Sequence, residues 1–222
     1  MKKGVVLLSG GIDSATTLFL AKEKGYNPRA LIFNYGQKNK KEVGCAKKIA
    51  KKTRTPYTVI KLPFSWKGSA LLDSHIKIPS GRSLKEIGEN IPSTYVPARN
   101  LVFLSVAASL AESVKAEGIF IGAHAEDYSG YPDCTKEFFE SFRKTLIRGT
   151  KEGRRIKIYT PLLKKDKTAI VKIGLRLGVP FEDTWSCYEG GKRPCGSCDS
   201  CIFRKNAFKR IGIPDPYFVR GR

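Results

Sequence analysis

A turn rich in glycine, Ser9-Gly10-Gly11-Ile12-Asp13-Ser14, stands between a short apolar run and a helical stretch. The apolar run, 5–8, has the length of a buried strand, and the helical stretch extends over 15–24. Glycines at such a turn let backbone N–H groups approach an anion, and the positive end of the helix dipole favours negative charge. The turn therefore predicts an α/β fold that binds an anion at the end of its first strand.

The turn differs from a Walker A motif because it contains no lysine and the pattern G-x-x-x-x-G-K-[ST] is absent. That lysine reaches the γ-phosphate in enzymes that transfer it. A turn without the lysine fits a departing pyrophosphate better, with ATP cleaved between its α- and β-phosphates. The alternative is a tight strand-to-helix turn that binds nothing.

Strand-like runs alternate with helical patterns along the chain, which is typical of a mostly parallel sheet with helices on both faces. The expected strands are 5–8, 30–33, 57–62, 118–122 and 156–159, and the expected helices are 15–24, 38–54, 99–117, 135–147 and 166–177. The apolar stripes that support the second and third helices are Val43, Ala46, Ile49 and Ala50, and Leu101, Leu104, Ala108 and Ala111. Residues 63–97 are irregular, and long irregular segments are usually functional or mobile. The length of 222 residues suits one α/β domain, 1–222, with a C-terminal metal-binding segment, 185–222.

The chain is strongly basic, with 41 Lys and Arg against 20 Asp and Glu and a formal net charge of +21. Such a charge favours anionic partners such as nucleotides or tRNA. A lysine-rich composition of the kind seen in hyperthermophiles explains it equally well. No apolar run approaches the ~20 residues of a membrane span, and Lys2 and Lys3 lead into an expected strand rather than a signal peptide. We therefore expect a cytoplasmic protein with no membrane partner.

Four of the six cysteines, Cys187, Cys195, Cys198 and Cys201, are close together near the C-terminus. In a reducing compartment such a cluster indicates a metal site rather than disulfides. Four thiolates complete the tetrahedral shell of a structural Zn²⁺ and leave no open position for substrate. An iron–sulfur cluster is the rival interpretation. We expect one structural zinc that fixes the C-terminal segment to the domain.

A polar, aromatic loop, Gly122 to Asp133, follows the fourth expected strand. Because ligands of open parallel sheets bind outside the carboxyl ends of the strands, this loop and the glycine turn should face one crevice. Carboxylates beside aromatic rings suit a guanine-like heterocycle, whose amine and ring N–H groups are donors. The candidates are Glu126, Asp127, Tyr131 and Asp133. A solvated acidic loop is the alternative, and His124 is either a proton-transfer group or a structural histidine.

The glycine turn resembles the signature of the PP-loop ATP pyrophosphatases. This resemblance implies an ATP site over Leu8, Ser9, Gly10, Gly11, Ile12, Asp13, Ser14, Ala15, Thr16, Thr17 and Leu18, with Asp13 also near Mg²⁺. The whole chain is similar to the QueC family. That similarity rests on the turn together with the stretches 34–37, 96–100, 127–134, 185–188 and 195–201. One departure is Ala98, where that family usually has glycine.

The resemblance implies an adenine nucleotide alpha hydrolase-like fold of the HUP type and an ATP-dependent carbon–nitrogen ligase. In that family 7-carboxy-7-deazaguanine is adenylated, ammonia displaces AMP to give the amide, and a second ATP activates the amide oxygen. Loss of AMP then leaves the nitrile, 7-cyano-7-deazaguanine (preQ0), for queuosine and archaeosine synthesis. Asp13, Arg99 and Lys167 would be catalytic, with the two cations offsetting charge on the α-phosphate. We expect ATP with Mg²⁺, the deazaguanine acid and ammonia as partners, a homodimer, and no direct contact with tRNA.

Two other functions remain open at this point. A PP-loop enzyme that modifies tRNA directly, by thiolation or lysidine-type ligation, would use the basic helix 38–54 and the basic tail. The basic residues of the tail are Arg204, Lys205, Lys209 and Arg210. Thiolation usually requires cysteines in the crevice, however, and only Cys134 lies on a candidate substrate loop. A non-enzymatic zinc-knuckle module that binds nucleic acid is the alternative of another class.

Overall fold

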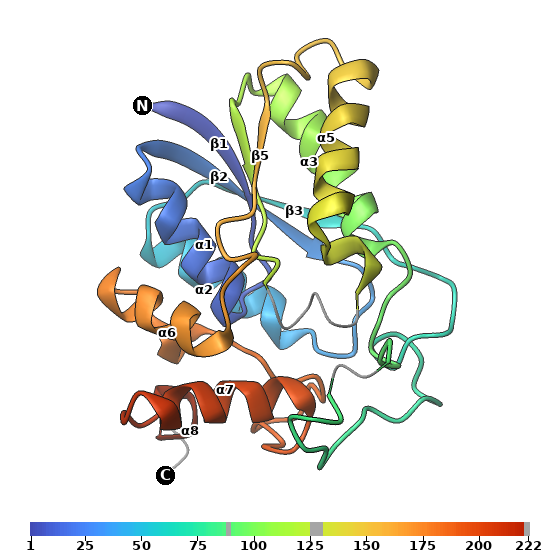
Figure 1. Ribbon diagram of the computed structural model, residues 1–222, viewed down its shortest axis with the longest axis vertical. Helices are drawn as coiled ribbons and strands as arrows, with labels where there is room; N and C mark the ends of the chain where they lie inside the picture. Colours follow the sequence, from blue (N-terminus) through green and yellow to red (C-terminus); the bar gives the residue numbers. More distant parts are fainter. Residues whose placement is uncertain (88–89, 125–130, 220–222) are drawn as a thin grey trace.

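A five-stranded parallel sheet with the strand order β3-β2-β1-β4-β5 forms the centre of the protein. The structure is a computed structural model and describes residues 1–87, 90–124 and 131–219 (Figure 1). The strands are β1 (Lys2–Leu7), β2 (Tyr26–Asn34), β3 (Tyr57–Lys61), β4 (Gly118–Phe120) and β5 (Lys157–Tyr159). The helices of eight or more residues are α1 (Ile12–Glu23), α2 (Lys41–Lys52), α3 (Arg99–Ser113), α5 (Lys136–Gly149), α6 (Lys167–Arg176) and α7 (Asp199–Arg210). The short α8 spans Pro216–Val219.

Helices cover both faces of this sheet, as the sequence predicts. Val5 and Leu7 of β1 pack into one apolar core with α3 and α5, while Val6 and Leu8 pack into a second core with α1, α2 and α6. Figure 1 shows α3 and α5 on one side of the strands and the other three helices on the opposite side. Successive side chains of a strand point to opposite faces, so a strand buried on both faces is apolar throughout.

The order of the strands creates a crevice between β1 and β4. From β1 the sheet continues outward through β2 to β3, and the chain then returns to place β4 on the other side of β1. The connections that leave β1 and β4 therefore go to opposite faces, which opens a ligand-binding crevice at the carboxyl ends of these strands. This topology brings the glycine turn after β1 beside the segment that follows β4.

The second strand is longer than the predicted strand 30–33, because it begins at Tyr26 and includes Pro28. Residues 26–29 look like a turn in sequence, with Asn27-Pro28 at their centre, yet they pair with β1. Over this part β2 has no second neighbour, since β3 pairs only from Ala30 onward. Proline lacks a backbone N–H and is tolerated where one side of a strand is unpaired.

The basic tail was predicted only in part. It forms helix α7, which the sequence analysis did not predict, and Arg204 on this helix is 1% exposed. Its guanidinium donates to both carboxylate oxygens of Asp215, at 2.7 and 2.8 Å. The expectation of a basic surface at Arg204 is therefore wrong, while Lys205, Lys209 and Arg210 are exposed. The apolar stripe of α3 also needs one correction, because Leu101 is 44% exposed.

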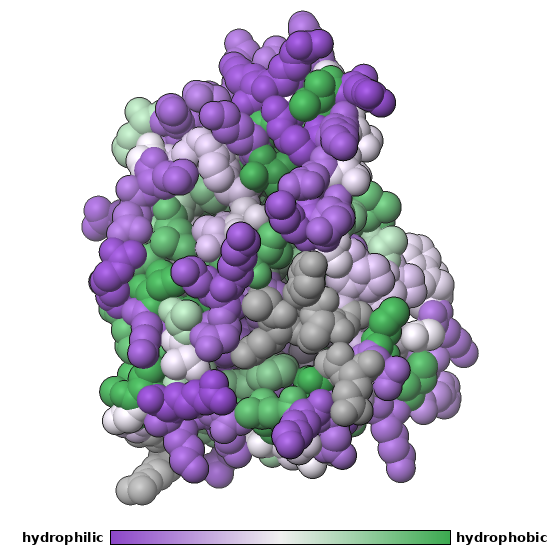
Figure 2. Space-filling model, in the orientation of Figure 1, coloured by the Kyte–Doolittle hydropathy of each residue, from purple (hydrophilic) through white to green (hydrophobic). Residues whose placement is uncertain are grey.

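The surface is mostly hydrophilic on the face that Figure 2 shows, with small apolar areas between the polar ones. Within residues 1–87, 90–124 and 131–219, every helix is too short or too polar to span a bilayer.

Candidate active site and metal centre

The glycine turn directs three successive backbone N–H groups toward the hydroxyls of Ser14 and Ser9. The hydroxyl of Ser14 accepts from the N–H of Ser9 at 3.1 Å and of Gly10 at 3.2 Å. The N–H of Gly11 donates to the Ser9 hydroxyl at 3.3 Å, and the two hydroxyls are 3.0 Å apart. Successive N–H groups that converge on one oxygen form an anion-binding nest. The nest lies at the N-terminus of α1, where the helix dipole adds positive potential.

Gly10 is required at its position for two independent reasons. Its φ is +95°, in the region that favours glycine. A Cβ there would also lie 2.3 Å from the carbonyl oxygen of Glu42 and 2.8 Å from the backbone nitrogen of Ala46. Helix α2 thus packs directly on the turn, and on the other side the N–H of Trp185 donates to the Gly10 carbonyl at 2.9 Å.

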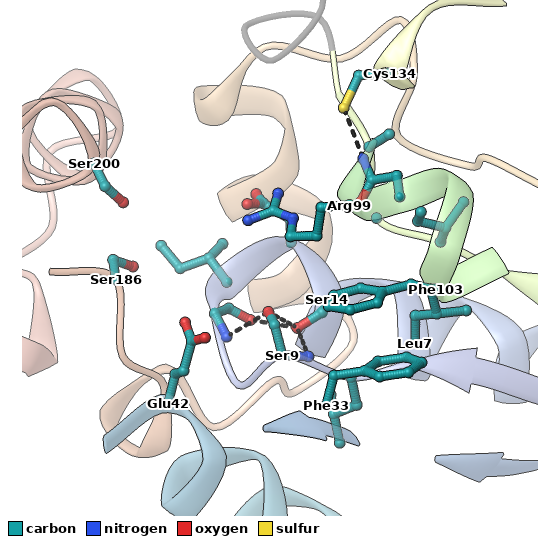
Figure 3. A pocket seen from close by; sticks show the side chains of 18 of the residues that line it. Leu7, Ser9, Ser14, Phe33, Glu42, Arg99, Phe103, Cys134, Ser186 and Ser200 are labelled. Carbon is teal, nitrogen blue, oxygen red and sulfur yellow. Dashed lines mark hydrogen bonds between the residues drawn. The ribbon is translucent and has the colours of Figure 1, made fainter. Parts of the chain in front are cut away.

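The turn forms one wall of a pocket at the carboxyl ends of β1 and β4 (Figure 3). The residues of the predicted ATP segment that line it are Leu8, Ser9, Gly11, Ile12, Asp13 and Ser14. Gly10 does not line the pocket, and neither do Ala15, Thr16, Thr17 and Leu18, which are fully buried in α1. The segment 8–18 is therefore part pocket wall and part helix core.

Asp13 and Lys167 form an ion pair at the edge of this pocket, although they are far apart in sequence. The Lys167 ammonium lies 2.8 and 2.9 Å from the two carboxylate oxygens of Asp13 and 2.9 Å from Nε2 of His124. Lys167 is the first residue of α6, and the side chain of Asp166 caps that helix by accepting from the N–H of Ala169 at 2.7 Å.

The electrostatics of this cluster keep Asp13 ionised. Burial alone would raise the pKa of Asp13, but Lys167 and His124 more than offset burial and lower the pKa below its usual value. His124 is 3% exposed, and its Nε2 lies 3.5 Å from a carboxylate oxygen of Asp13. Nε2 of His124 thus lies between the Lys167 ammonium and the Asp13 carboxylate, and its role as donor or acceptor depends on the tautomer.

Arg99 reaches the same pocket from the N-terminus of α3. Figure 3 shows its guanidinium directed into the pocket. One nitrogen donates to the hydroxyl of Tyr35 at 3.4 Å, and the guanidinium lies 5.9 Å from the centre of that ring. Burial would lower the pKa of Arg99, but Tyr35 and Tyr131 raise it above its usual value. The pocket is therefore lined by Arg99 from α3 and Lys167 from α6, besides Arg204 of α7, whose charge is paired with Asp215.

The residue before Arg99 has a backbone conformation that favours glycine. Ala98 has φ +54° and ψ +22°, a left-handed conformation that is unfavourable for a residue with a Cβ. The N–H of Ala98 donates to the hydroxyl of Tyr95 at 3.1 Å, which helps to fix this conformation. The backbone thus retains a geometry that glycine would adopt without strain.

We expect Ala98→Gly to stabilise the protein by about 0.5–1 kcal/mol, because the relief of the left-handed strain exceeds the added entropy of the unfolded chain. Chemical denaturation at constant slope measures this change. Ala108→Gly in the middle of α3 is the matched control, and it should destabilise. A loss of stability in Ala98→Gly would contradict the assignment of strain.

The predicted substrate loop is only partly within the described residues. Glu126 and Asp127 lie outside them. Tyr131 lines the pocket; its ring stacks on that of Tyr95 at 5.8 Å between centroids, and its hydroxyl lies 3.0 Å from that of Thr94. Asp133 does not line the pocket; it is 7% exposed and accepts from the N–H of Asn100 at 2.7 Å. Asp133 thus satisfies a backbone donor in the first turn of α3.

One carboxylate of the pocket was missed in the sequence analysis. Glu42 of α2 lines the pocket, and its Oε1 accepts from the side-chain amide of Gln37 at 2.8 Å. Burial raises the pKa of Glu42 to about 7, against the opposing effects of Gln37 and Arg99. The available signal was that Glu42 is the only acidic residue in the basic stretch 38–54.

The four clustered cysteines come together as the sequence predicts. The sulfur atoms of Cys187, Cys195, Cys198 and Cys201 all lie within 4.8 Å of one another. A tetrahedron of thiolates with metal–sulfur bonds of about 2.3 Å has edges of about 3.8 Å, so this cluster is of the right size. Backbone N–H groups donate to the sulfur of Cys187 from Glu189 at 3.4 Å and from Cys195 at 3.3 Å. N–H···S bonds of this kind stabilise thiolates as metal ligands.

The cysteine cluster also fixes the irregular segment 63–97. Ser80 pairs with Cys198 in an antiparallel bridge, and the N–H of Gly81 donates to the carbonyl of Ser197 at 2.9 Å. Arg82 forms an ion pair with Asp199, directly after the third cysteine. The cluster therefore joins the C-terminal segment to the long segment that precedes α3 and Arg99.

The family model of "Queuosine biosynthesis protein QueC" matches residues 3–212 of this chain. The sequence is 49% identical to 7-cyano-7-deazaguanine synthase of Clostridium kluyveri, over 100% of this chain and 99% of that protein. It is 47% identical to the protein of the same name from Thermoplasma acidophilum, over 97% of this chain and 91% of that protein.

Solved structures of lower sequence identity share the fold. NMN synthetase from Francisella tularensis has a TM-score of 0.50 at 16% identity, covering 99% of this chain and 81% of that chain. A predicted subunit of a tRNA methyltransferase from Methanocaldococcus jannaschii has a TM-score of 0.50 at 21% identity, covering 99% and 94%. These two likenesses concern the fold alone, and they agree with the fold class expected from the sequence.

Proposed function

Because the chain belongs to the QueC family, we propose that its pocket carries out the ATP-dependent conversion of 7-carboxy-7-deazaguanine and ammonia into 7-cyano-7-deazaguanine. The protein is an ATP-dependent carbon–nitrogen ligase of the queuosine and archaeosine pathways. In the proposed sequence, ATP adenylates the carboxylate and ammonia displaces AMP to give the amide. A second ATP then activates the amide oxygen, and loss of AMP leaves the nitrile.

The observation that carries this proposal is the nest of N–H groups at the glycine turn beside two cations. We assign the pyrophosphate of ATP to the N–H groups of residues 9–11 and to the Ser14 hydroxyl. Arg99 and Lys167 offset the charge that develops on the α-phosphate while pyrophosphate leaves. Fixed donors and cations in a partly buried site supply most of the catalysis of such a transfer, since they need no reorganisation during the reaction.

The deazaguanine is assigned to the part of the pocket that Tyr131 lines. The aromatic face of Tyr131, held by its contact with Tyr95, offers a stacking surface for a heterocycle. We also propose that Glu126 and Asp127 accept hydrogen bonds from the N–H groups of the deazaguanine. Asp133 is assigned an indirect role, because its carboxylate accepts from the first turn of α3 and thereby positions Arg99.

Two metal ions complete the proposal. Zn²⁺ fits the four-thiolate cluster, where its role would be structural because the cluster leaves no position open for substrate. Mg²⁺ would accompany ATP; Asp13 is the carboxylate of the glycine turn and is held ionised, as an oxygen ligand for Mg²⁺ must be. When bound there, Mg²⁺ would neutralise phosphate charge.

The assembly that we propose is a homodimer. Its support is the exposure of large apolar side chains on the segment 63–97, where Trp66 is 49%, Leu84 39% and Ile91 59% exposed.

The reaction is tested with purified protein, ATP, Mg²⁺, 7-carboxy-7-deazaguanine and ammonium. We expect AMP and pyrophosphate to be released, and both amide and nitrile to be detected by mass spectrometry. Two AMP should form for each nitrile. Release of ADP instead of AMP would overturn the mechanism, and AMP release that requires tRNA instead of the free base would favour direct tRNA modification.

A further inference from the structure

A second carboxylate faces the pocket from the side opposite α6. Glu42 lies in the first turn of α2, the helix that packs on Gly10, so it is fixed relative to the phosphate-binding turn. Figure 3 shows its carboxylate rising from α2 into the pocket, whose lining also includes Ser9 and Ser186. Its Oε1 accepts from Gln37, while among the described residues no protein donor reaches its Oε2.

Gln37 fixes the orientation of this carboxylate. Its side chain is 2% exposed and donates to the carbonyl of Phe33 at 3.3 Å as well as to Glu42 at 2.8 Å. Its oxygen accepts from the N–H of Tyr35 at 2.9 Å. Three hydrogen bonds therefore hold the Gln37 amide, two to the carboxyl end of β2 and one to α2. Oε1 of Glu42 is thus occupied by Gln37, and Oε2 of Glu42 is left for a ligand.

The reaction proposed above removes all three protons from one nitrogen atom. In the first stage the nitrogen of ammonia forms a bond to the acyl carbon, the carbon–oxygen bond to AMP breaks, and one proton leaves the nitrogen. In the second stage the amide oxygen bonds to the α-phosphorus, pyrophosphate leaves, and the nitrogen loses a second proton. The carbon–oxygen bond then breaks, and AMP leaves with its electrons. The nitrogen loses its third proton in this step, and the nitrile forms.

We propose that the Glu42 carboxylate accepts these protons from the nitrogen and passes each one to solvent, with Gln37 as its positioning residue. This inference rests on the proposed function and deepens it, because it assigns the pocket wall at α2 to the ammonia-derived nitrogen. Glu42 recognises that nitrogen as ammonia or ammonium before attack and as an N–H group afterwards.

The other ionisable groups of the pocket are less suited to this task. Asp13, the other carboxylate among the described lining residues, is paired with Lys167, and its lowered pKa makes it a poor proton acceptor. His124 Nε2 is engaged by the same lysine. In the described part of the chain no cation lies within salt-bridge distance of Glu42, and burial raises its pKa to about 7, where a carboxylate can both accept and release a proton near neutral pH.

The charged and titratable groups that face Glu42 come from three elements. Arg99 of α3 lowers its pKa, in the same direction as the hydrogen bond from Gln37. Tyr35, after β2, and Cys45 of α2 are neutral near pH 7, because burial raises the pKa of both. The pKa of Glu42 is therefore set by burial, which raises it, and by the hydrogen bond from Gln37 and the charge of Arg99, which lower it.

The test compares wild type with Glu42→Gln, which keeps the shape of the side chain and removes its capacity to accept a proton. Amide formation is measured with ammonium, with rates expressed per free ammonia, and hydroxamate formation is measured with hydroxylamine. The nitrogen of hydroxylamine is less basic than that of ammonia, so after attack it loses its proton more readily and depends less on a base. We expect the amide rate to fall by 10²-fold or more and the hydroxamate rate to change by less than about 5-fold.

The pH profile gives a second readout that a structural role would not change. In wild type the amide rate per free ammonia should fall below about pH 7, as Glu42 becomes protonated. Glu42→Gln should have no such limb. The matched control is Glu182→Gln, which removes a half-buried carboxylate outside the pocket and should retain both rates and the limb.

The outcomes separate this inference from the function on which it rests. Equal losses with ammonium and hydroxylamine would overturn the role of Glu42 in proton transfer and favour recognition of the heterocycle. An unchanged amide rate and pH limb in Glu42→Gln would overturn it as well. Failure of wild type to release AMP from ATP and 7-carboxy-7-deazaguanine would instead refute the proposed function.

Discussion

Replacement of Lys167 by methionine is expected to lower formation of AMP from ATP and 7-carboxy-7-deazaguanine by about 10²- to 10³-fold, since removal of one group that stabilises transition-state charge has a cost of this order. Methionine retains most of the apolar stem and removes the ammonium. The change also removes the strongest influence that lowers the pKa of Asp13, so a larger fraction of Asp13 should be protonated at a given pH. Exchange of pyrophosphate into ATP, measured without ammonia so that the adenylate can revert, reports this step directly.

Lys172→Met is the matched control, because Lys172 lies on the same helix and is exposed. It should retain a rate within about 2-fold of wild type. Thermal unfolding of both variants distinguishes loss of chemistry from loss of fold. A Lys167→Met protein that is folded and retains more than a third of the exchange rate would refute the assignment of Lys167 to the α-phosphate.

The pairing of Lys167 with Asp13 shows what a single sequence contains and what it omits. The glycine turn could be recognised because its chemistry depends on adjacent residues, whose spacing the sequence gives directly. Asp13 and Lys167 were both expected to be catalytic, but their contact depends on how α6 packs against α1. No local pattern encodes such a packing, so the pair and its effect on the pKa of Asp13 required the structure.

Arg204 illustrates the opposite error. A basic tail is usually a solvated surface, and Arg204 stands beside Lys205 in such a tail. In the structure its guanidinium is buried and satisfied by Asp215, the Thr184 hydroxyl and the Phe181 carbonyl. The acceptors come from segments up to 23 residues away, so composition alone could not reveal them.

Glu42 was missed for a related reason. A lone acidic residue in a basic helix would ordinarily face solvent and form surface ion pairs. Its inward position follows from the close approach of α2 to Gly10, which only a glycine permits. The glycine turn therefore has two consequences: it exposes N–H groups to an anion and it admits a carboxylate beside them.

The metal centre lies outside the pocket lining, yet its neighbours reach the pocket on two sides. Cys187 is two residues after Trp185, whose N–H holds the glycine turn, and both Trp185 and Ser186 line the pocket. The cluster also fixes 80–82, in the segment that leads to α3 and Arg99. A metal that closes this cluster would therefore organise the pocket without taking part in the reaction.

Replacement of Cys201 by serine is expected to remove the metal and to lower the melting temperature by about 10 °C or more. The binding free energy of a structural metal is folding free energy. The melting temperature changes by roughly 2–4 °C per kcal/mol in a chain of this size, so a loss of about 4 kcal/mol lowers it by about 8–16 °C. Cys201 is fully buried at the start of α7, so water from bulk solvent cannot take the place of the missing thiolate as a metal ligand. Metal content by mass spectrometry and thermal unfolding measure the two effects.

Cys45→Ser is the control, because Cys45 is half-buried on α2 and is not part of the cluster. It should retain one metal per chain and a melting temperature near that of wild type. Treatment of wild type with a strong chelator should reproduce the loss seen in Cys201→Ser, and addition of Zn²⁺ should restore stability to the treated wild type only. If the purified protein contains iron and acid-labile sulfide, the four cysteines bind an iron–sulfur cluster and not zinc. Wild-type protein that contains no metal and is unaffected by the chelator would show that the four thiols pack without an ion.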